Sequence, residues 1–288
     1  MRALAQYVMR GPRQAGTVAV LATAIPYLSW IGAAVVGLVI LRLGTAQGLT
    51  IALWALLPAL GWAWVASDPT VISVLLLVFL MAAVLRRTVS WEKSLLAGSA
   101  LGLVIGLLIP VLFAGMLREV TEAFLDVYQW AYPEMAEQLG DELEPALRGM
   151  VEGLMPGSYL SLAVAVTMLS RYWQAALYNP GGFRREFHDF RLTRGVAALC
   201  VLLLLVAPVV GINPLLLGWV AGLPLLVAGI ALVHGVVGRK RASNLWLVVF
   251  YALLVVQGFT ISLLLMLLAI VDSWLDFRGR IRPAGPAE

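Results

Sequence analysis

The sequence predicts an all-α fold, a polytopic transmembrane helical bundle with about 8 to 9 membrane segments. Of the 288 residues, 61% are hydrophobic and only 12% are charged, and the mean hydropathy is +0.93. Soluble proteins carry about 25% charged residues. Because segment 94–117 is apolar on every side, it does not show the alternation of a membrane β-strand. The spans are therefore predicted to be helices.

Nine apolar segments follow one another along the chain: 15–27, 30–43, 48–66, 70–85, 94–117, 158–177, 196–210, 215–237 and 245–271. The first two allow alternatives. Region 15–43 is either one helix kinked at Pro26 or a hairpin of two short helices, since proline breaks the helical hydrogen-bond ladder.

Basic clusters decide in favour of the hairpin. They occur at 2–13, 86–93, 184–194 and 239–241, and positive loops favour the cytoplasm. Four crossings before Arg86 keep the first two clusters on one side. A single last span, however, places Arg278, Arg280 and Arg282 outside. Either the tail is an exception or the count of spans is wrong by one.

The whole chain, 1–288, is predicted to be a single transmembrane domain with a cytoplasmic loop at 178–195 and a short polar tail at 273–288. Segment 118–152 holds nine acids against two arginines, so it is predicted outside. There Leu143, Leu147, Met150, Val151 and Leu154 recur at helical spacing with acids opposite. We expect amphipathic helices that rest on the bundle as a lid; the alternative is a partner-docking surface.

Residues for catalysis or metal binding are not indicated. The single cysteine, Cys200, allows neither an internal disulfide nor a cysteine metal cluster. No phosphate-loop, dinucleotide, nucleophile-elbow or zinc motif occurs. His188 is interpreted as solvated and His234 as a buried polar contact. The sequence predicts no enzyme, no metal and no cofactor, and the net charge of +4 reflects membrane orientation rather than nucleic-acid binding.

The span interiors are nearly free of charged residues, whereas ion-coupled carriers place such residues within their spans. Asp68 and Asp272 are predicted at outer helix ends, each as a boundary residue or a cap. This pattern favours a protein that binds its ligand passively and takes energy from a partner.

Uncharged polar and aromatic residues toward the predicted outer half form a candidate pocket for a neutral or weakly polar ligand. They are Tyr27, Ser29, Trp30, Asn213, Gln257 and Thr260. For Gln257 and Thr260 the alternative is a hydrogen bond to another helix.

Two stripes of small residues indicate close helix packing. They consist of Gly98, Gly102 and Gly106, and of Gly218 and Gly222. Packing within the chain is favoured, and an interface with another membrane subunit is the alternative.

The most distinctive string, 171–188, runs from a helix end into a cytoplasmic loop. Asn179, Gly181 and Gly182 stop the helix in a tight turn. The string is interpreted as a helix stop with a charge anchor. Alternatively it docks a partner through Trp173, Gln174, Asn179, Gly181, Gly182, Phe183, Arg184 and Arg185.

This string, with the closing segment 272–278 (Asp-Ser-Trp-Leu-Asp-Phe-Arg), resembles the YybS-like family of predicted bacterial membrane proteins, a group similar to the S components of energy-coupling-factor transporters. The resemblance implies an S-component-like fold in the bacterial inner membrane, with a membrane coupling subunit and an ATPase as partners. In S components, small residues at A-x-x-x-A spacing in the first helix contact the coupling subunit, and Ala15 and Ala19 match that spacing.

The leading hypothesis is therefore a non-enzymatic inner-membrane protein that binds a small molecule and is energised by a partner. A membrane scaffold or morphogenesis protein is the second hypothesis. A lipid-handling protein or intramembrane enzyme is the third.

Overall fold

The structure is a computed structural model that describes residues 2–25 and 27–281, and all regular elements within them are helical. This confirms the all-α prediction. Pro26 and the tail 282–288 lie outside the described residues. The helices are α1 (Arg2–Val8), α2 (Pro12–Ala24), α3 (Ser29–Leu43), α4 (Thr45–Val65), α5 (Thr70–Thr88), α6 (Trp91–Leu112), α7 (Ala114–Ala131), α8 (Pro133–Leu139), a 3-10 turn η1 (Gly140–Glu142), α9 (Leu143–Tyr178), α10 (Gly182–Asp189), α11 (Arg194–Val206), α12 (Pro214–Arg239), α13 (Leu245–Val256), α14 (Gly258–Leu275) and α15 (Phe277–Arg280).

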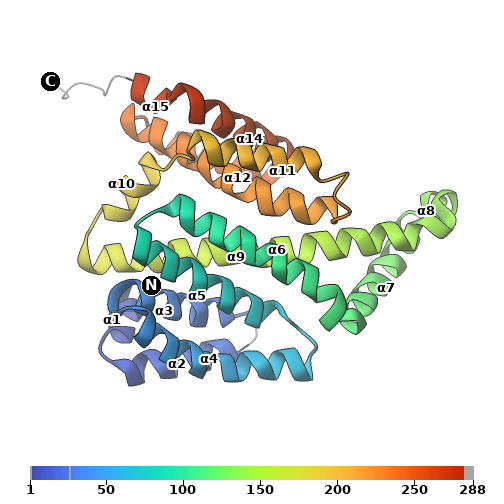
Figure 1. Cartoon of the computed structure of the whole chain (residues 1–288), viewed down its shortest axis with the longest axis horizontal. Coiled ribbons are helices and arrows are strands. Elements are labelled where there is room, and N and C mark those ends of the chain that lie inside the picture. Colours follow the sequence, from blue (N-terminus) through green and yellow to red (C-terminus); the bar gives the residue numbers. More distant parts are fainter. Residues whose placement is uncertain (1, 26, 282–288) are drawn as a thin grey trace.

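Helix α9 is the central element of the bundle. It packs against α3 and α5 on one side and against α6 and α12 on others. Figure 1 shows α1 to α5 below it and α11, α12, α14 and α15 above it. Within the amino-terminal group, α3 is buried without interruption from Gly32 to Leu41, because other helices surround it. The uniformly apolar sequence of α3 fits this position.

Six described helical segments are long and apolar enough to cross a membrane. They are α4, α5, α6, α12, α14 and the segment Pro133–Tyr178, which contains α9. Helices α3, α11 and α13 are apolar but shorter. The chain is therefore compatible with an integral membrane protein. The number of 8 to 9 crossings remains a prediction.

The predicted hairpin in region 15–43 is confirmed, since α2 and α3 are separate helices that pack on each other. A Cβ atom at Gly32 would lie 2.1 Å from Thr23 Oγ1, so glycine permits this close approach. The Trp62 indole donates a hydrogen bond to the Thr23 carbonyl at 3.1 Å, which ties α4 to the end of α2.

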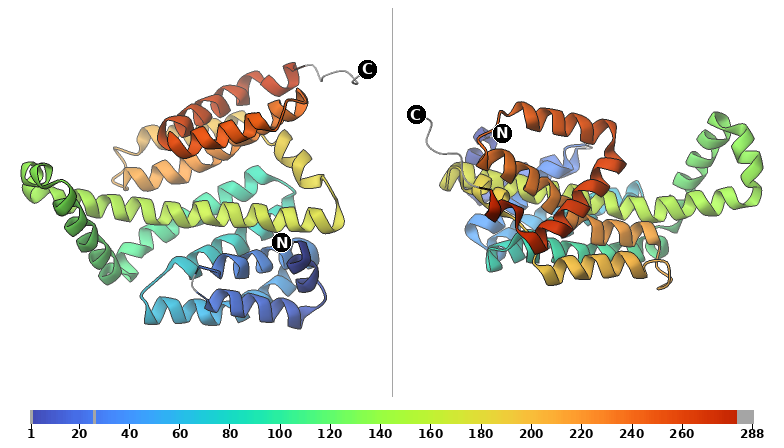
Figure 2. Two further views of the ribbon diagram at one scale, coloured as in Figure 1. Left: turned by 180° about the vertical axis from the view of Figure 1, so that it is seen from behind. Right: turned by 90° about the horizontal axis from the view of Figure 1, so that it is seen from above.

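The predicted single span 245–271 is wrong. The chain breaks at Gln257 into α13 of 12 residues and α14 of 18 residues, which form an open hairpin (Figure 2, right). Gly258 weakens the helix by about 1 kcal/mol relative to alanine, and Gln257 lies exposed at the break. Because α14 runs back, Arg278 lies beside the loop after α10 rather than at the opposite end. The extra turn removes the misfit between the last basic cluster and the others.

The acidic segment forms an arm, defined as α7, α8, η1 and the first turns of α9. Leu143, Leu147 and Val151 are buried on α9, which packs against α7, so this part of the predicted amphipathic stripe is confirmed. Met150 and Leu154 of the same stripe are 48% and 39% exposed. The predicted resting lid is wrong, because the arm projects beyond the bundle (Figures 1 and 2). Helix α9 runs unbroken for 36 residues, about 54 Å at 1.5 Å per residue. That length exceeds the bilayer core of about 30 Å.

The first glycine stripe packs within the chain, as favoured from the sequence. Cβ atoms at Gly98, Gly102 and Gly106 would meet Met81, Leu160 and Leu216 at 2.8, 3.2 and 2.5 Å. These contacts join α6 to α5, α9 and α12.

Only part of the second glycine stripe packs within the chain. A Cβ at Gly222 would lie 3.1 Å from Met266, whereas Gly218 has no described atom within 4 Å of its Cβ position. The prediction that Gly218 packs within the chain is therefore wrong, and its alternative role at an interface with another subunit stays a prediction. Gly229 lies at a close approach of α12 to α14, since a Cβ there would lie 2.4 Å from the Leu265 carbonyl oxygen.

Candidate functional site

Charged and polar side chains gather at one end of the bundle, which we call the basic end. It comprises the last turns of α9, α12 and α14, the short helices α10 and α15, and the loop that follows α10. This is the end opposite the arm (Figure 1). The segments 171–191 and 272–280, far apart in sequence, are in contact here.

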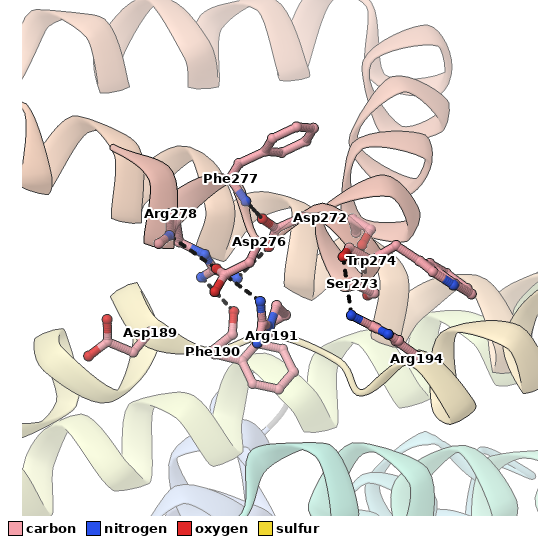
Figure 3. A network of polar contacts seen from close by, with 12 residues as sticks. Asp189, Phe190, Arg191, Arg194, Asp272, Ser273, Trp274, Asp276, Phe277 and Arg278 are labelled. Atoms are coloured by element: carbon pink, nitrogen blue, oxygen red, sulfur yellow. Dashed lines mark hydrogen bonds and ion pairs between the residues drawn. The ribbon is translucent and has the colours of Figure 1, made fainter. Parts of the chain in front are cut away.

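A buried ion pair lies at the centre of these contacts. Arg278 Nη2 donates to Asp272 Oδ2 at 2.7 Å, and the two side chains are only 3% and 2% exposed. Arg278 Nη1 also donates to the carbonyls of His188 and Phe190 at 2.9 and 2.7 Å. Figure 3 shows Arg278 reaching from α15 toward both Asp272 and the loop. The interpretation of Asp272 as an outer boundary residue is therefore wrong.

Exposed ion pairs reinforce the same junction. Arg191 Nη1 lies 2.9 Å from Asp276 Oδ1, and Arg239 Nη2 lies 3.2 Å from Asp189 Oδ1. Arg239 also donates to the Arg278 carbonyl. The carboxyl-terminal segment is thus attached to α12 and to the loop after α10. Sequence reasoning missed this network, because no local pattern links residue 278 to residue 188.

The distinctive string 171–188 folds back on itself. Arg171 pairs with Glu186 through two hydrogen bonds and also donates to the Gln174 side-chain oxygen. Gln174 donates in turn to the Leu41 carbonyl at 2.9 Å, so the end of α3 joins the same junction. The turn itself needs glycine at 181, where φ is +80°. Its predicted role as a helix stop with a charge anchor fits these contacts.

Aromatic rings connect α10 to the rest of the basic end. Phe183 stacks on Phe187 at 5.8 Å and meets Trp91 edge-on at 6.2 Å. Phe187 in turn meets the His234 ring at 5.4 Å. Helix α10 is therefore held against α6 and α12 by ring contacts as well as by charge.

Two glycines of α12 make room for His188. A Cβ at Gly235 would lie 2.5 Å from the His188 carbonyl oxygen, and one at Gly238 would lie 2.6 Å from the imidazole. The His188 and His234 ring centroids are 6.1 Å apart. His234 Nε2 is hydrogen bonded to the Tyr251 hydroxyl at 2.9 Å, which connects α12 to α13.

These side chains surround a cavity of about 390 Å³, which we call the basic-end pocket. Its walls come from α10, α12, the following turn and α13. Burial, followed by the charge of Arg184, lowers the pKa of His188 below its ordinary value, while Asp189 acts in the opposite direction. The lining residues are Arg184, His188, His234, Val237, Gly238, Arg241, Ala242, Asn244 and Leu247.

The predicted docking residues divide into buried and exposed groups. Ala15, Ala19 and Trp173 are 2%, 0% and 0% exposed, so the chain itself covers them. Gly182 is also buried, and Gln174 and Phe183 are half-buried. Asn179, Gly181, Arg184 and Arg185 are exposed on the turn and α10. Of the predicted docking residues, these last four are the exposed ones, and the A-x-x-x-A pair serves packing inside this chain.

The six candidate pocket residues lie in three separate places. Tyr27, Ser29 and Trp30 surround the α2–α3 turn, where the Trp30 indole donates to the Tyr27 carbonyl at 2.8 Å. Asn213 caps α12 by accepting from the Leu215 and Leu216 amides, and it donates to the Gly149 carbonyl at 2.7 Å. Gln257 and Thr260 are exposed near the α13–α14 break. These residues do not come together around one cavity.

Among the described residues, no group of three or more His, Cys, Asp or Glu side chains is placed to hold a metal ion. Comparison with protein-family models, curated proteins and solved structures finds no match to this chain. Its function must be inferred from its own residues and their geometry.

Proposed function

We propose that this is a multi-pass protein of the bacterial cytoplasmic membrane, with its basic end in the cytoplasm and its arm outside. Support comes from the distribution of charge. The clusters around Arg184, Arg239 and Arg278 belong to the basic end, and the acids of segment 118–152 belong to the arm. The Arg86 cluster lies next to the basic end, because Arg86 and Gln174 both donate to the Leu41 carbonyl. Positive residues favour the cytoplasmic side of a membrane.

Cysteine accessibility tests this orientation. In a Cys200→Ser background, Glu137→Cys in the arm should react with a membrane-impermeant maleimide on spheroplasts. Arg185→Cys and Arg280→Cys should react only after permeabilisation. Labelling of Arg280→Cys together with Glu137→Cys would show that α13 and α14 do not return the chain to the basic end.

Within that membrane, we propose that the protein works by binding a ligand and relies on a partner for energy, as an S-component-like subunit. One observation carries this proposal. In the described spans, Asp, Glu, Lys, Arg and His side chains lie within about two turns of the basic end or belong to the arm. A proton or ion relay would need such groups along its path through the membrane.

We also propose that the chain is related to the YybS-like family, and the support is a contact between two of its segments. The two strings that carry the resemblance to the YybS-like family meet at the basic end, where Arg278 binds the carbonyl next to Phe187. The exposed turn with Asn179, Gly181 and Arg185 is the surface that we propose for a coupling subunit and its ATPase.

Site-specific crosslinking tests the partner. A photoreactive residue at Arg185 should capture a membrane coupling subunit or an ATPase, identified by mass spectrometry. The same residue at Trp64, which is 89% exposed outside the basic end, is the control. If position 185 captures no such protein and no ATPase co-purifies in mild detergent, the partner-energised function is refuted.

The lipid-handling hypothesis is the second candidate, because the basic-end pocket gathers ionisable groups where α12 meets the start of α13. The scaffold hypothesis has less support. The Gly98 stripe is occupied by contacts within the chain, which leaves only the loop after α9 for such a role.

A further inference from the structure

The described lining of the basic-end pocket holds two arginines and two histidines. Arg184 comes from α10, Arg241 from the turn after α12, and two imidazoles come from His188 and His234. No carboxylate is among the described residues that line the pocket. The two acids of α10, Glu186 and Asp189, pair with Arg171 and Arg239. The pocket is therefore electropositive and offers N–H donors from several directions.

Arg184 differs from four other arginines of this end. Arg171, Arg191, Arg239 and Arg278 each pair with a carboxylate. Arg184 pairs with none in the part of the chain that the structure describes, although its charge acts on both pocket histidines. Its guanidinium is thus available to an external anion.

The pocket is assembled before any ligand arrives. His188 packs so closely against Gly235 and Gly238 that neither position has room for a larger side chain. The His188 carbonyl accepts a hydrogen bond from Arg278. His234 is fixed between the Phe187 ring and the Tyr251 hydroxyl. A preassembled site loses little conformational freedom on binding. Its volume of about 390 Å³ lies in the range of about 300–1,000 Å³ that is typical of ligand pockets.

The surroundings of the pocket are apolar and face outward. Helix α13, which supplies Leu247 to the lining, has no buried residue, and Leu245, Trp246 and Val248 are 70%, 65% and 63% exposed. In a bilayer such a face contacts acyl chains, and a tryptophan near a helix end suits the interface. A ligand at this place can combine an anionic group with hydrocarbon.

We propose that the basic-end pocket binds the phosphate group of an anionic membrane lipid, whose acyl chains lie along α13. The Arg184 guanidinium binds two phosphate oxygens through its planar fork of donors. His188, His234 and Asn244 supply further hydrogen bonds. Basic pockets between helices at a membrane surface are suited to such head groups. This site is independent of any partner protein.

Native mass spectrometry of the full-length protein in a non-ionic detergent tests the site. The probes are dioleoyl phosphatidic acid, dioleoyl phosphatidylcholine and inorganic phosphate. We expect phosphatidic acid to bind at least about tenfold more tightly than the other two, since charge-assisted hydrogen bonds and chain contacts act together only there. Arg184→Gln should weaken phosphatidic acid binding by about fivefold to tenfold.

Two further variants distinguish the possible origins of binding. Arg185→Gln removes the same charge from a neighbouring exposed position that does not line the pocket, so its affinity should stay within about twofold of wild type. Trp246→Ser should weaken the binding of phosphatidic acid and leave the affinity for inorganic phosphate unchanged.

Three results would overturn the proposal. Equal losses in Arg184→Gln and Arg185→Gln would indicate general surface charge rather than a pocket. Inorganic phosphate that binds as tightly as phosphatidic acid would indicate a soluble anion. Equal affinity for phosphatidylcholine would remove the role of charge.

Discussion

Replacing Asp272 by Asn isolates the contribution of the buried ion pair at the basic end. Asparagine keeps the shape of aspartate and can still accept from the Phe277 amide, which lies 2.8 Å from Oδ1. The substitution removes the negative charge that faces Arg278, whose side chain is only 3% exposed. Arg278 would then be a buried cation held by two carbonyl oxygens and no carboxylate.

The magnitude follows from this burial. Removing one partner of a buried pair costs about 3–5 kcal/mol, because the remaining charge is uncompensated. At about 2–4 °C per kcal/mol, the unfolding temperature should fall by roughly 6 to 20 °C. The double variant Asp272→Asn, Arg278→Gln should recover part of the loss, since it leaves no buried charge.

The assay is thermal unfolding of the purified protein in detergent, followed by tryptophan fluorescence. Asp276→Asn is the matched control: Asp276 and its partner Arg191 are 51% and 39% exposed, so their pair contributes about 0–1 kcal/mol. Asparagine also preserves the cap that Asp276 provides to the Gly279 amide. If Asp272→Asn and Asp276→Asn melt within about 2 °C of each other, the reasoning about the buried pair is refuted.

Three further changes test the fold and the site. Gly229→Ala should destabilise the protein by about 1–3 kcal/mol by forcing a backbone contact between α12 and α14, whereas Gly218→Ala, with open space around it, should stay within about 0.5 kcal/mol; equal melting temperatures would contradict this packing. Asn213→Ala should cost about 1–2 kcal/mol in thermal unfolding through loss of the α12 cap, and an unchanged melting temperature would disprove that role. His188 has a lowered pKa, so its neutral form stabilises the fold above pH 6.5 and this contribution is lost as the pH falls toward the pKa of the folded state. The melting temperature of the wild type should therefore fall between about pH 7 and pH 5, and that of His188→Gln should vary less. Equal pH profiles of the two proteins would contradict the assignment. The charged and titratable groups around His188 are Arg184, Asp189, His234 and Arg278.

The amino-acid sequence alone determined the class and much of the layout. Apolar length required membrane-compatible helices, because water does not solvate such a chain. The basic clusters at 2–13 and 86–93 lie on one side only if an even number of crossings separates them, and this was enough to predict a hairpin in region 15–43. The stripe at Gly98 indicated close packing, because glycine at helical spacing lets backbones approach. Each of these features is written in local composition or in a short repeat.

Only the tertiary structure decided how the carboxyl-terminal third is arranged. Segment 245–271 is apolar on all sides, so no periodicity distinguishes a straight span from the broken pair α13 and α14. Lipid and protein interiors are similarly apolar, and hydropathy therefore does not report which face packs.

The basic-end pocket depends on the same arrangement. His188 and His234 come together because Gly235 and Gly238 admit α10, and Arg278 holds the loop that follows. These are contacts between residues far apart in sequence, and their partners are set by how the helices turn and cross. The composition of the chain specified apolar helices that are compatible with a membrane. The return of α14 to the basic end, which buries Arg278 against Asp272, is a property of the folded chain alone.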